Sequence, residues 1–269
     1  MAKSKKRGLT KKNEDELIQT LNDFAGWLVK KKIAKNLSNI DHTVEMPFAN
    51  EDWTMKVDEK NKNVSFNTFL VEKSSFKYYK MVIVHEFFHL AVQRVPNKED
   101  STRIKDDFGE ELMKLIDIEA DFFTALYFKE KLGYGLIDYL KLYYEGSRVF
   151  YDRRIRGVKL ERFIGSLLSI TKMFLIPVSK KEDVAWDLYL PTINPVYTEE
   201  SLHVLVIRRE HIYLDEIKAS YQDFVDIKKC YINIDKLSVK GYVDELIKFS
   251  CRALKIEVPE KVQNEINLL

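Results

Sequence analysis

Apolar residues recur at helical spacing in most of this chain and alternate with polar residues in a few segments. Between Glu14 and Ile33 the apolar positions lie three or four residues apart, which predicts an amphipathic helix. The same periodicity, bounded by capping residues, glycine and proline, predicts further helices at 74–93, 106–131, 135–148, 160–175 and 243–253. Residues 53–58 and 63–67 alternate around a turn-rich segment, which predicts a β-hairpin.

Two later segments, 202–216 and 226–235, are rich in β-branched and aromatic residues, so we expect strands there. The predicted fold class is therefore α+β, with a mostly helical core that carries an edge β-hairpin and an α+β C-terminal region. We expect three parts in the chain: a basic flexible tail at 1–14, a core domain at 15–150, and an accessory or recognition region at 151–269.

Composition and charge exclude several classes of protein. Hydrophobic residues make up 45% of the 269 positions, which excludes a disordered chain, and 44 Lys and Arg against 42 Asp and Glu argue against a nucleic-acid partner. Two cysteines, Cys230 and Cys251, exclude a disulfide scaffold and indicate a reducing compartment. The most apolar stretch, 163–178, is shorter than the ~20 residues that cross a bilayer. We expect a cytoplasmic protein without a membrane partner.

The candidate chemistry lies on the predicted helix at 74–93, which contains the motif His85-Glu86-Phe87-Phe88-His89, a match to H-E-x-x-H. Residues four apart share a helix face about 6 Å apart along the axis, so both imidazoles can bind one zinc ion at roughly 2.1 Å. Zinc lowers the pKa of a bound water towards about 7, and Glu86 can accept its proton. Two histidines and a carboxylate in an apolar helix are costly to bury alone, which favours a metal over a chance match.

A catalytic zinc site needs a third protein ligand, and the predicted helix at 106–131 offers three carboxylates. Asp117 and Asp121 are four residues apart and share a face. Glu119 lies about 200° away from each, because successive residues rotate by ~100°. A solvated acidic face is the competing interpretation.

This combination, over approximately Trp53 to Leu132, resembles the gluzincin clan of zinc metallopeptidases, especially its soluble ImmA/IrrE-type members and the cores of HtpX-like proteases. In that pattern an acidic ligand precedes a final Asp or Asn by four positions. The resemblance therefore implies Asp117 as third ligand, where the clan usually has Glu, and Asp121 as the outer partner of a ligand histidine. Asp is one methylene shorter than Glu, so Glu119 stays the alternative, although the shared helix face favours Asp117.

The resemblance also implies that the edge hairpin accepts an extended peptide, although a hairpin that only covers the core fits the pattern equally well. Zincins usually polarise the scissile carbonyl with a His, Tyr or Arg side chain. The sequence offers several such residues and does not choose among them: Tyr143, Tyr144, Arg148, Tyr151, His203 and His211.

The function that we expect is intracellular, zinc-dependent hydrolysis of peptide bonds in a protein or peptide substrate, with Zn²⁺ as cofactor and Glu86 as the general base. The alternative is a catalytically silent zincin scaffold that acts as a binding or sensing module. Intact Glu86 favours the enzyme, because zinc binding alone does not require it. A third interpretation, a DNA-associated SprT-like protease, is weakened by the near-neutral charge and by the absence of a third histidine soon after the motif.

Overall fold

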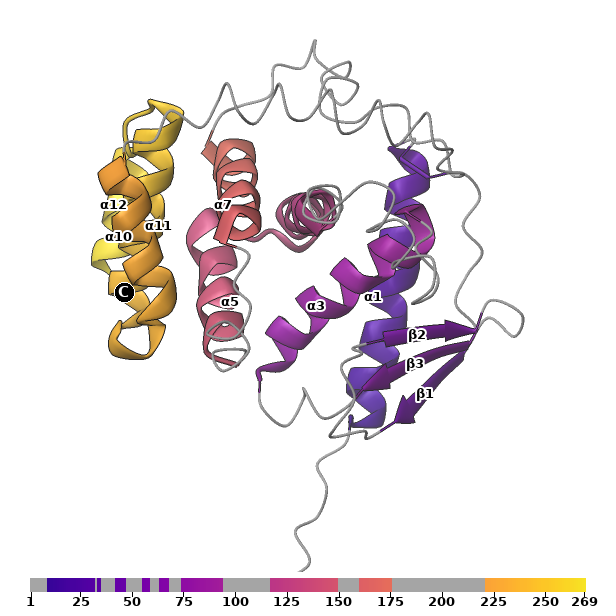
Figure 1. Ribbon diagram of the computed structural model, residues 1–269. Coiled ribbons are helices and arrows are strands. Elements are labelled where there is room, and N and C mark those ends of the chain that lie inside the picture. The colour runs from indigo at the N-terminus through magenta and orange to yellow at the C-terminus, as the bar shows by residue number, and fades with distance from the viewer. Residues whose placement is uncertain are drawn as a thin grey trace, which may run out of the picture. The chain divides into compact units, whose positions relative to one another are not determined.

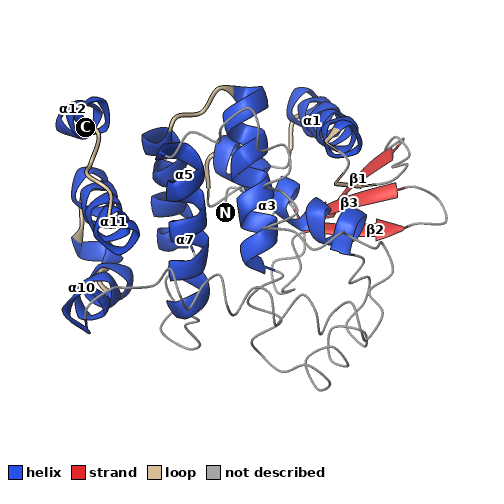
Figure 2. Cartoon of the chain, turned by 90° about the horizontal axis from the view of Figure 1, so that it is seen from above, coloured by secondary structure: helices blue, strands red, loops and turns tan. Residues whose placement is uncertain are grey.

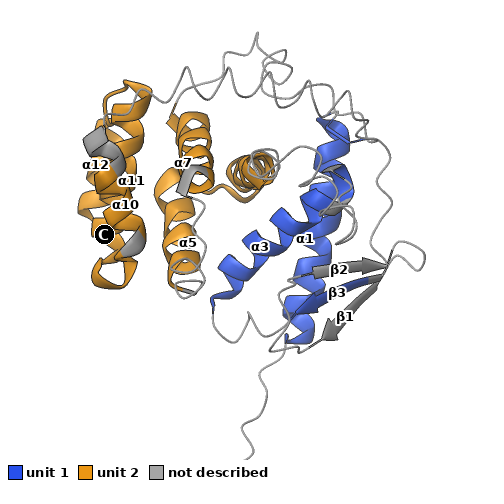
Figure 3. Ribbon diagram, in the orientation of Figure 1, with its two compact units in different colours: residues 1–94 blue, residues 95–269 orange. Residues whose placement is uncertain are grey.

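Figure 1 shows the computed structural model of the protein. In the part of the chain that it describes, the protein is mostly helical, with one three-stranded sheet (Figure 2). The chain divides into two compact units, residues 1–94 and 95–269 (Figure 3), while the domain limit suggested near residue 150 stays a prediction. The described residues are 9–31, 33–34, 42–46, 55–58, 63–67, 74–93, 117–149, 160–175 and 221–269.

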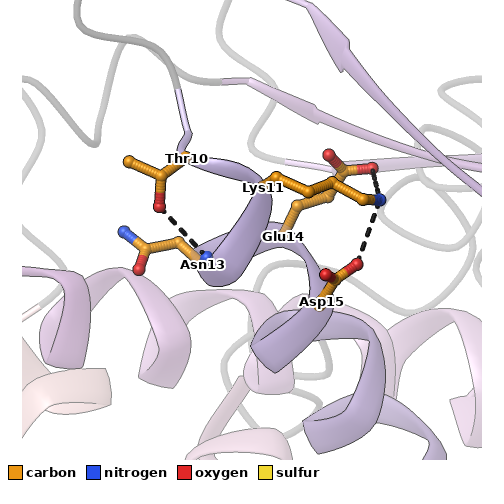
Figure 4. Close-up of polar contacts among 5 residues, drawn as sticks. All are labelled: Thr10, Lys11, Asn13, Glu14 and Asp15. Atoms are coloured by element: carbon orange, nitrogen blue, oxygen red, sulfur yellow. Dashed lines mark hydrogen bonds and ion pairs between the residues drawn. The ribbon is translucent and has the colours of Figure 1, made fainter.

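The first helix, α1 (Lys11–Lys30), begins inside the stretch predicted as a flexible tail. Thr10 caps it, because its side-chain oxygen accepts a hydrogen bond from the Asn13 N–H at 3.2 Å, which replaces a missing intrahelical acceptor. The Lys11 ammonium also pairs with Glu14 at 3.7 Å and Asp15 at 3.0 Å (Figure 4). These contacts within the first turn explain why α1 begins before Glu14. Residues 1–8 of the predicted tail lie outside the described part of the chain.

In the first unit, α1 packs against α3 (Phe76–Phe88) through the apolar face that the sequence predicted. The Phe24 ring lies 6.2 Å from the Phe87 ring and 6.5 Å from the Phe88 ring, measured between centroids. An ion pair between Lys80 of α3 and Glu16 of α1 borders this contact. The helix α1 therefore supports one side of the helix that carries the H-E-x-x-H motif.

The sheet consists of β1 (His42–Met46), β2 (Met55–Asp58) and β3 (Asn63–Asn67), in the order β1-β3-β2. β2 and β3 are antiparallel neighbours, which confirms the predicted hairpin, whereas β1, parallel to β3, was not predicted. Contacts join α1 to β1 and α3 to β2, and the Tyr79 hydroxyl donates to the Asn67 carbonyl of β3 at 3.2 Å. The motif helix is therefore tied to the sheet as well as to α1.

The second unit contains helices joined by short connections, and no strand among its described residues. Its first described helix, over residues 117–132, ends before Gly133, whose φ of 71° is a left-handed conformation that glycine adopts readily, as the sequence predicted. The remaining elements are α5 (Leu136–Val149), α7 (Leu160–Leu175), α10 (Tyr221–Ile232), the 3₁₀ turn η2 (Ile234–Lys236), α11 (Val239–Leu254) and α12 (Glu260–Asn267). Of these, α10, η2 and α12 were not predicted from the sequence.

The predicted strand at 226–235 is wrong, because these residues form most of α10 and the turn that follows it. Ile227, Cys230, Tyr231 and Ile234 are all buried, and their spacing of three, four and seven residues places them on one helical face. The helical period therefore outweighs the β-propensity of the individual residues. The described C-terminal residues are helical rather than α+β, and the other predicted strand, 202–216, lies outside the described residues.

Both cysteines are buried and neither forms a disulfide, and Cys230 lies on α10 rather than on a strand. Burial raises the pKa of the Cys251 thiol to about 11. These side chains therefore behave as small apolar residues of the core. Among the described helices, none combines the length and the apolar character that a membrane crossing requires.

Candidate metal centre

The motif helix α3 begins at the cap residue Ser75, whose hydroxyl accepts from the Tyr78 N–H at 3.2 Å. The helix is apolar on most of its circumference, as predicted, and it stays in α-helical register through His89, whose N–H donates to the His85 carbonyl. The buried side chains of this helix are Tyr78, Tyr79, Ile83, Val84, Phe87 and Phe88. One α-helical turn therefore separates the two histidines of the motif, as the spacing required.

The two imidazoles face each other. Their Nε2 atoms are 3.0 Å apart, and the rings meet edge to face with centroids 4.7 Å apart. Two ligands of a tetrahedral zinc ion, each at about 2.1 Å, lie roughly 3.4 Å apart, so a small side-chain movement brings His85 and His89 to ligand geometry. Glu86 follows His85 directly and is half-buried, about 100° around the helix from its neighbour.

A π-helical turn, His89–Gln93, begins at the second histidine of the motif. Hydrogen bonds in a π-helix span five residues instead of four, which makes such turns rare, and they occur frequently at functional sites. The regular α-helix thus ends at the residue that completes the H-E-x-x-H motif.

Asp117 joins the two histidines in a group that could hold a metal ion. One ligand atom from each of His85, His89 and Asp117 lies within 4.8 Å of the other two, and no other such group occurs among the residues that the structure describes. Two imidazoles and one carboxylate suit Zn²⁺ and other divalent transition metals, and three protein ligands leave a fourth position for water or substrate. The donor set therefore fits the predicted cofactor, while the identity of the metal stays a prediction.

The other two candidate carboxylates have different surroundings. Glu119 is buried, with 4% of its surface exposed, and it does not belong to the group. Asp121 accepts a hydrogen bond from the Ser166 hydroxyl at 2.6 Å. The choice of Asp117 over Glu119 as a ligand, and the pairing of Asp121 with a ligand histidine, stay predictions. His42, an upstream histidine, lies on the strand β1.

Sequence reasoning missed the residues that hold these carboxylates. Arg162 of α7 forms an ion pair with Asp117, with Nη1 2.8 Å from Oδ2, and Ser166 of the same helix binds Asp121. Arg162 and Ser166 are four residues apart and share one face of a helix that was predicted with correct limits. The four-residue spacing shows that the two side chains share a face of α7. Nothing in the sequence indicates which other element that face contacts.

The described residues among those predicted to polarise a substrate carbonyl divide into two groups. The Tyr144 hydroxyl donates to the Leu237 carbonyl at 2.9 Å, and the Arg148 guanidinium lies 5.9 Å from the Tyr144 ring centroid, so both have structural contacts. The Tyr143 hydroxyl is buried and has no hydrogen-bond partner in the described part of the protein. Tyr151, His203 and His211 lie outside the described residues.

Burial also raises the pKa of the Tyr143 phenol well above its ordinary value of about 10. The negative charge of Asp121 acts in the same direction, while the positive charge of Arg162 opposes it. Tyr143 is therefore a neutral phenol at physiological pH. The two charges that act on it belong to Asp121, one of the candidate carboxylates, and to Arg162, the partner of Asp117.

The chain matches no protein-family model, and comparison with curated proteins and with solved structures finds no match either.

Proposed function

We propose that this protein is a zinc-dependent metallopeptidase in which His85, His89 and Asp117 bind the metal and Glu86 is the general base. The observation that supports the proposal best is the grouping of the three ligand atoms within 4.8 Å of one another, with Glu86 directly beside one of them in the chain. Three protein ligands from two imidazoles and a carboxylate are typical of catalytic rather than structural zinc sites.

When bound at this group, zinc supplies a Lewis acid that acidifies water and polarises a carbonyl. His85 and His89 would present their Nε2 atoms from one face of α3, and Asp117 would add a negative charge that balances part of the metal's charge. Glu86 is offset around the helix from both histidines, so its carboxylate is not used as a ligand. It accepts a proton from the attacking water and passes it to the leaving amine.

The substrate class that we propose is a protein or peptide, in agreement with the resemblance to gluzincins. A cytoplasmic location suits the two cysteines, which are buried and form no disulfide, because thiols persist in a reducing compartment. A resident zinc would be the cofactor.

The decisive test combines metal analysis with a proteolysis assay on Glu86→Gln. Elemental analysis of the purified protein should find about one zinc per chain, and a His85→Ala/His89→Ala variant should contain almost none. Because Glu86 contacts water rather than metal, Glu86→Gln should keep its zinc and its circular-dichroism spectrum while cleavage of fluorescent casein falls at least about a hundredfold.

The matched control is Glu245→Gln, the same change at an exposed position on α11. It should cleave casein at the wild-type rate. Equal cleavage by wild type and Glu86→Gln would show that Glu86 is not the base. A zinc-loaded wild type that cleaves neither casein nor any protein in a proteome-wide digest would favour the silent scaffold instead.

A further inference from the structure

Helix α7 runs alongside the helix at 117–132 in the same direction. Three contacts show this: the Asp117–Arg162 ion pair, the Ser166–Asp121 hydrogen bond, and a 2.6 Å hydrogen bond from the Lys129 ammonium to the Met173 carbonyl. In each contact the partners are 44 or 45 residues apart in sequence. A sequence separation that stays nearly constant along both helices is expected only when the two helices run in the same direction.

A glycine keeps the two helices close. A Cβ atom at Gly165 would lie 2.5 Å from Cδ1 of Ile118, which is closer than carbon atoms approach one another. Gly165 lies between Arg162 and Ser166 in the sequence of α7, so the close approach occurs at the level of the two carboxylates. Because Gly165 has no side chain, α7 lies close enough for Arg162 to reach Asp117 and for the short Ser166 side chain to reach Asp121.

We propose that α7 is the positioning element of the metal site, in which Arg162 orients Asp117 for metal binding and Ser166 orients Asp121. This inference rests on the proposed function. Carboxylates that bind metals in proteins are themselves held by hydrogen bonds from a surrounding layer of residues. A carboxylate has two oxygens and about four acceptor sites, so contact with Arg162 through Oδ2 is compatible with metal binding by the same side chain.

The charge of Arg162 gives the arrangement a second role. Asp117 is half-buried, and a half-buried carboxylate without a cation nearby is costly. The guanidinium compensates this charge before a metal arrives, so the ligand is held in place in the metal-free protein. Arg162 and Ser166 are positioning residues, because they act through the two aspartates rather than on the metal.

The experiment measures the zinc dissociation constant, by competition with a chelating dye, for the full chain and its variants. Arg162→Met should weaken zinc binding about 10- to 100-fold, the usual effect of removing an outer partner of a ligand. Arg162→Lys, which keeps the charge but not the planar donor group, should lose less. Ser166→Ala should weaken binding by less than Arg162→Met, because Asp121 is not itself a ligand.

Two control variants remove the same groups elsewhere in the second unit. Arg252→Met removes an exposed arginine of α11, and Ser147→Ala removes a buried serine whose hydroxyl is 2.9 Å from that of Tyr242. Both should bind zinc within about twofold of wild type. Thermal unfolding of the metal-free variants separates general loss of stability from loss of metal affinity.

A double-mutant cycle then distinguishes positioning from a purely structural ion pair. If Arg162 acts through Asp117, Arg162→Met should have almost no further effect on zinc affinity in an Asp117→Asn background. Additive effects, or wild-type affinity in Arg162→Met, would overturn this inference alone. A wild-type chain that binds no zinc would overturn the proposed function itself. If Arg162→Met does not fold, Arg162→Lys and Ser166→Ala decide by the same criteria.

Discussion

The histidines of α3 and the carboxylates of the helix at 117–132 are placed by different kinds of contact. His85 and His89 are brought to an Nε2 separation of 3.0 Å by one turn of their own helix. Asp117 and Asp121 are also one turn apart, but each is held by a residue of α7 that lies 45 positions later in the sequence. The first arrangement is local, and the second depends on tertiary packing.

This difference explains which part of a metal site a sequence can reveal. Spacing of four residues within a helix is sufficient to bring two side chains together, so H-E-x-x-H predicts its own geometry. A carboxylate that depends on a distant arginine leaves no comparable pattern, and Asp117 could be preferred over Glu119 only by its helix face and by resemblance. Substitutions on the helix at 117–132 therefore test the assignment of Asp117 as a ligand and of Asp121 as an outer partner.

The largest effect that we expect comes from a matched series of acid-to-amide changes on the carboxylate helix. Asp117→Asn removes a charged ligand and should weaken zinc binding by more than about 100-fold, whereas Asp121→Asn removes an outer partner and should weaken it about 10- to 100-fold. Glu119→Gln keeps the volume of a buried side chain outside the group and should leave the affinity close to that of wild type. Competition with a chelating dye measures all three.

A ranking in which Glu119→Gln loses more zinc than Asp117→Asn would show that the helix-face argument chose the wrong residue. Metal-free thermal unfolding of each variant serves as the control, because an amide at a buried position can lower stability without affecting a ligand.

A smaller effect is expected from two neighbouring tyrosines of α5. Tyr143→Phe removes a buried hydroxyl that has no hydrogen-bond partner among the described residues and should raise the free energy of unfolding by up to about 1–3 kcal/mol. Tyr144→Phe removes the donor to the Leu237 carbonyl and should lower it by about 0.5–1.5 kcal/mol. Urea unfolding of the two variants compares the same chemical change in adjacent residues.

The two tyrosines should also differ at alkaline pH. Because the pKa of Tyr143 is raised in the folded state, the unfolded chain loses its phenolic proton first as the pH rises above about 10, and the free energy of unfolding falls from there until the folded-state pKa is passed. Tyr143→Phe should remove part of this decline. An unchanged alkaline slope would indicate that the Tyr143 phenol reaches solvent.

The smallest effect concerns the close approach of α7 at Gly165. Gly165→Ala adds a methyl group next to Ile118, at a cost of about 1–3 kcal/mol of overpacking, offset by about 1 kcal/mol of helix propensity. Ile118→Val removes the Cδ1 atom that the new methyl group would meet, so the double variant should be more stable than the sum of the single changes predicts. Urea unfolding measures this coupling. If the two changes in the free energy of unfolding simply add, the methyl group at position 165 does not clash with Ile118, and α7 can move away from the helix at 117–132 at little cost.

Most helices of the fold could be predicted because their apolar positions are strictly periodic. The limits of α7 were predicted without error, and the end of the helix at 117–132 followed from Gly133. The strand predicted at 226–235 failed because β-branched and aromatic residues were given more weight than the spacing of Ile227, Cys230, Tyr231 and Ile234. The sequence therefore contains the helical signal at these positions.

Other features leave no signal in a single sequence. The strand β1 pairs directly with β3 although β2 lies between them in the sequence, and such non-local pairing is set by the tertiary fold. The roles of Arg162 and Ser166 depend on which helix α7 contacts. In the sequence the hydroxyl of Tyr143 is one of several candidate groups. Its burial, and the absence of a hydrogen-bond partner among the described residues, distinguish it from the hydroxyl of Tyr144.

The 45-residue separation between the aspartates and their partners has a consequence for the order of events during folding. Closing a loop of that length costs about 3 kcal/mol of chain entropy beyond a constant term, whereas the histidine pair forms with its own helix and closes no long loop. Helices form within about a microsecond, and contacts between distant segments form later. Zinc present during folding would therefore meet the two imidazoles first, and the carboxylate would complete the coordination only after α7 has docked.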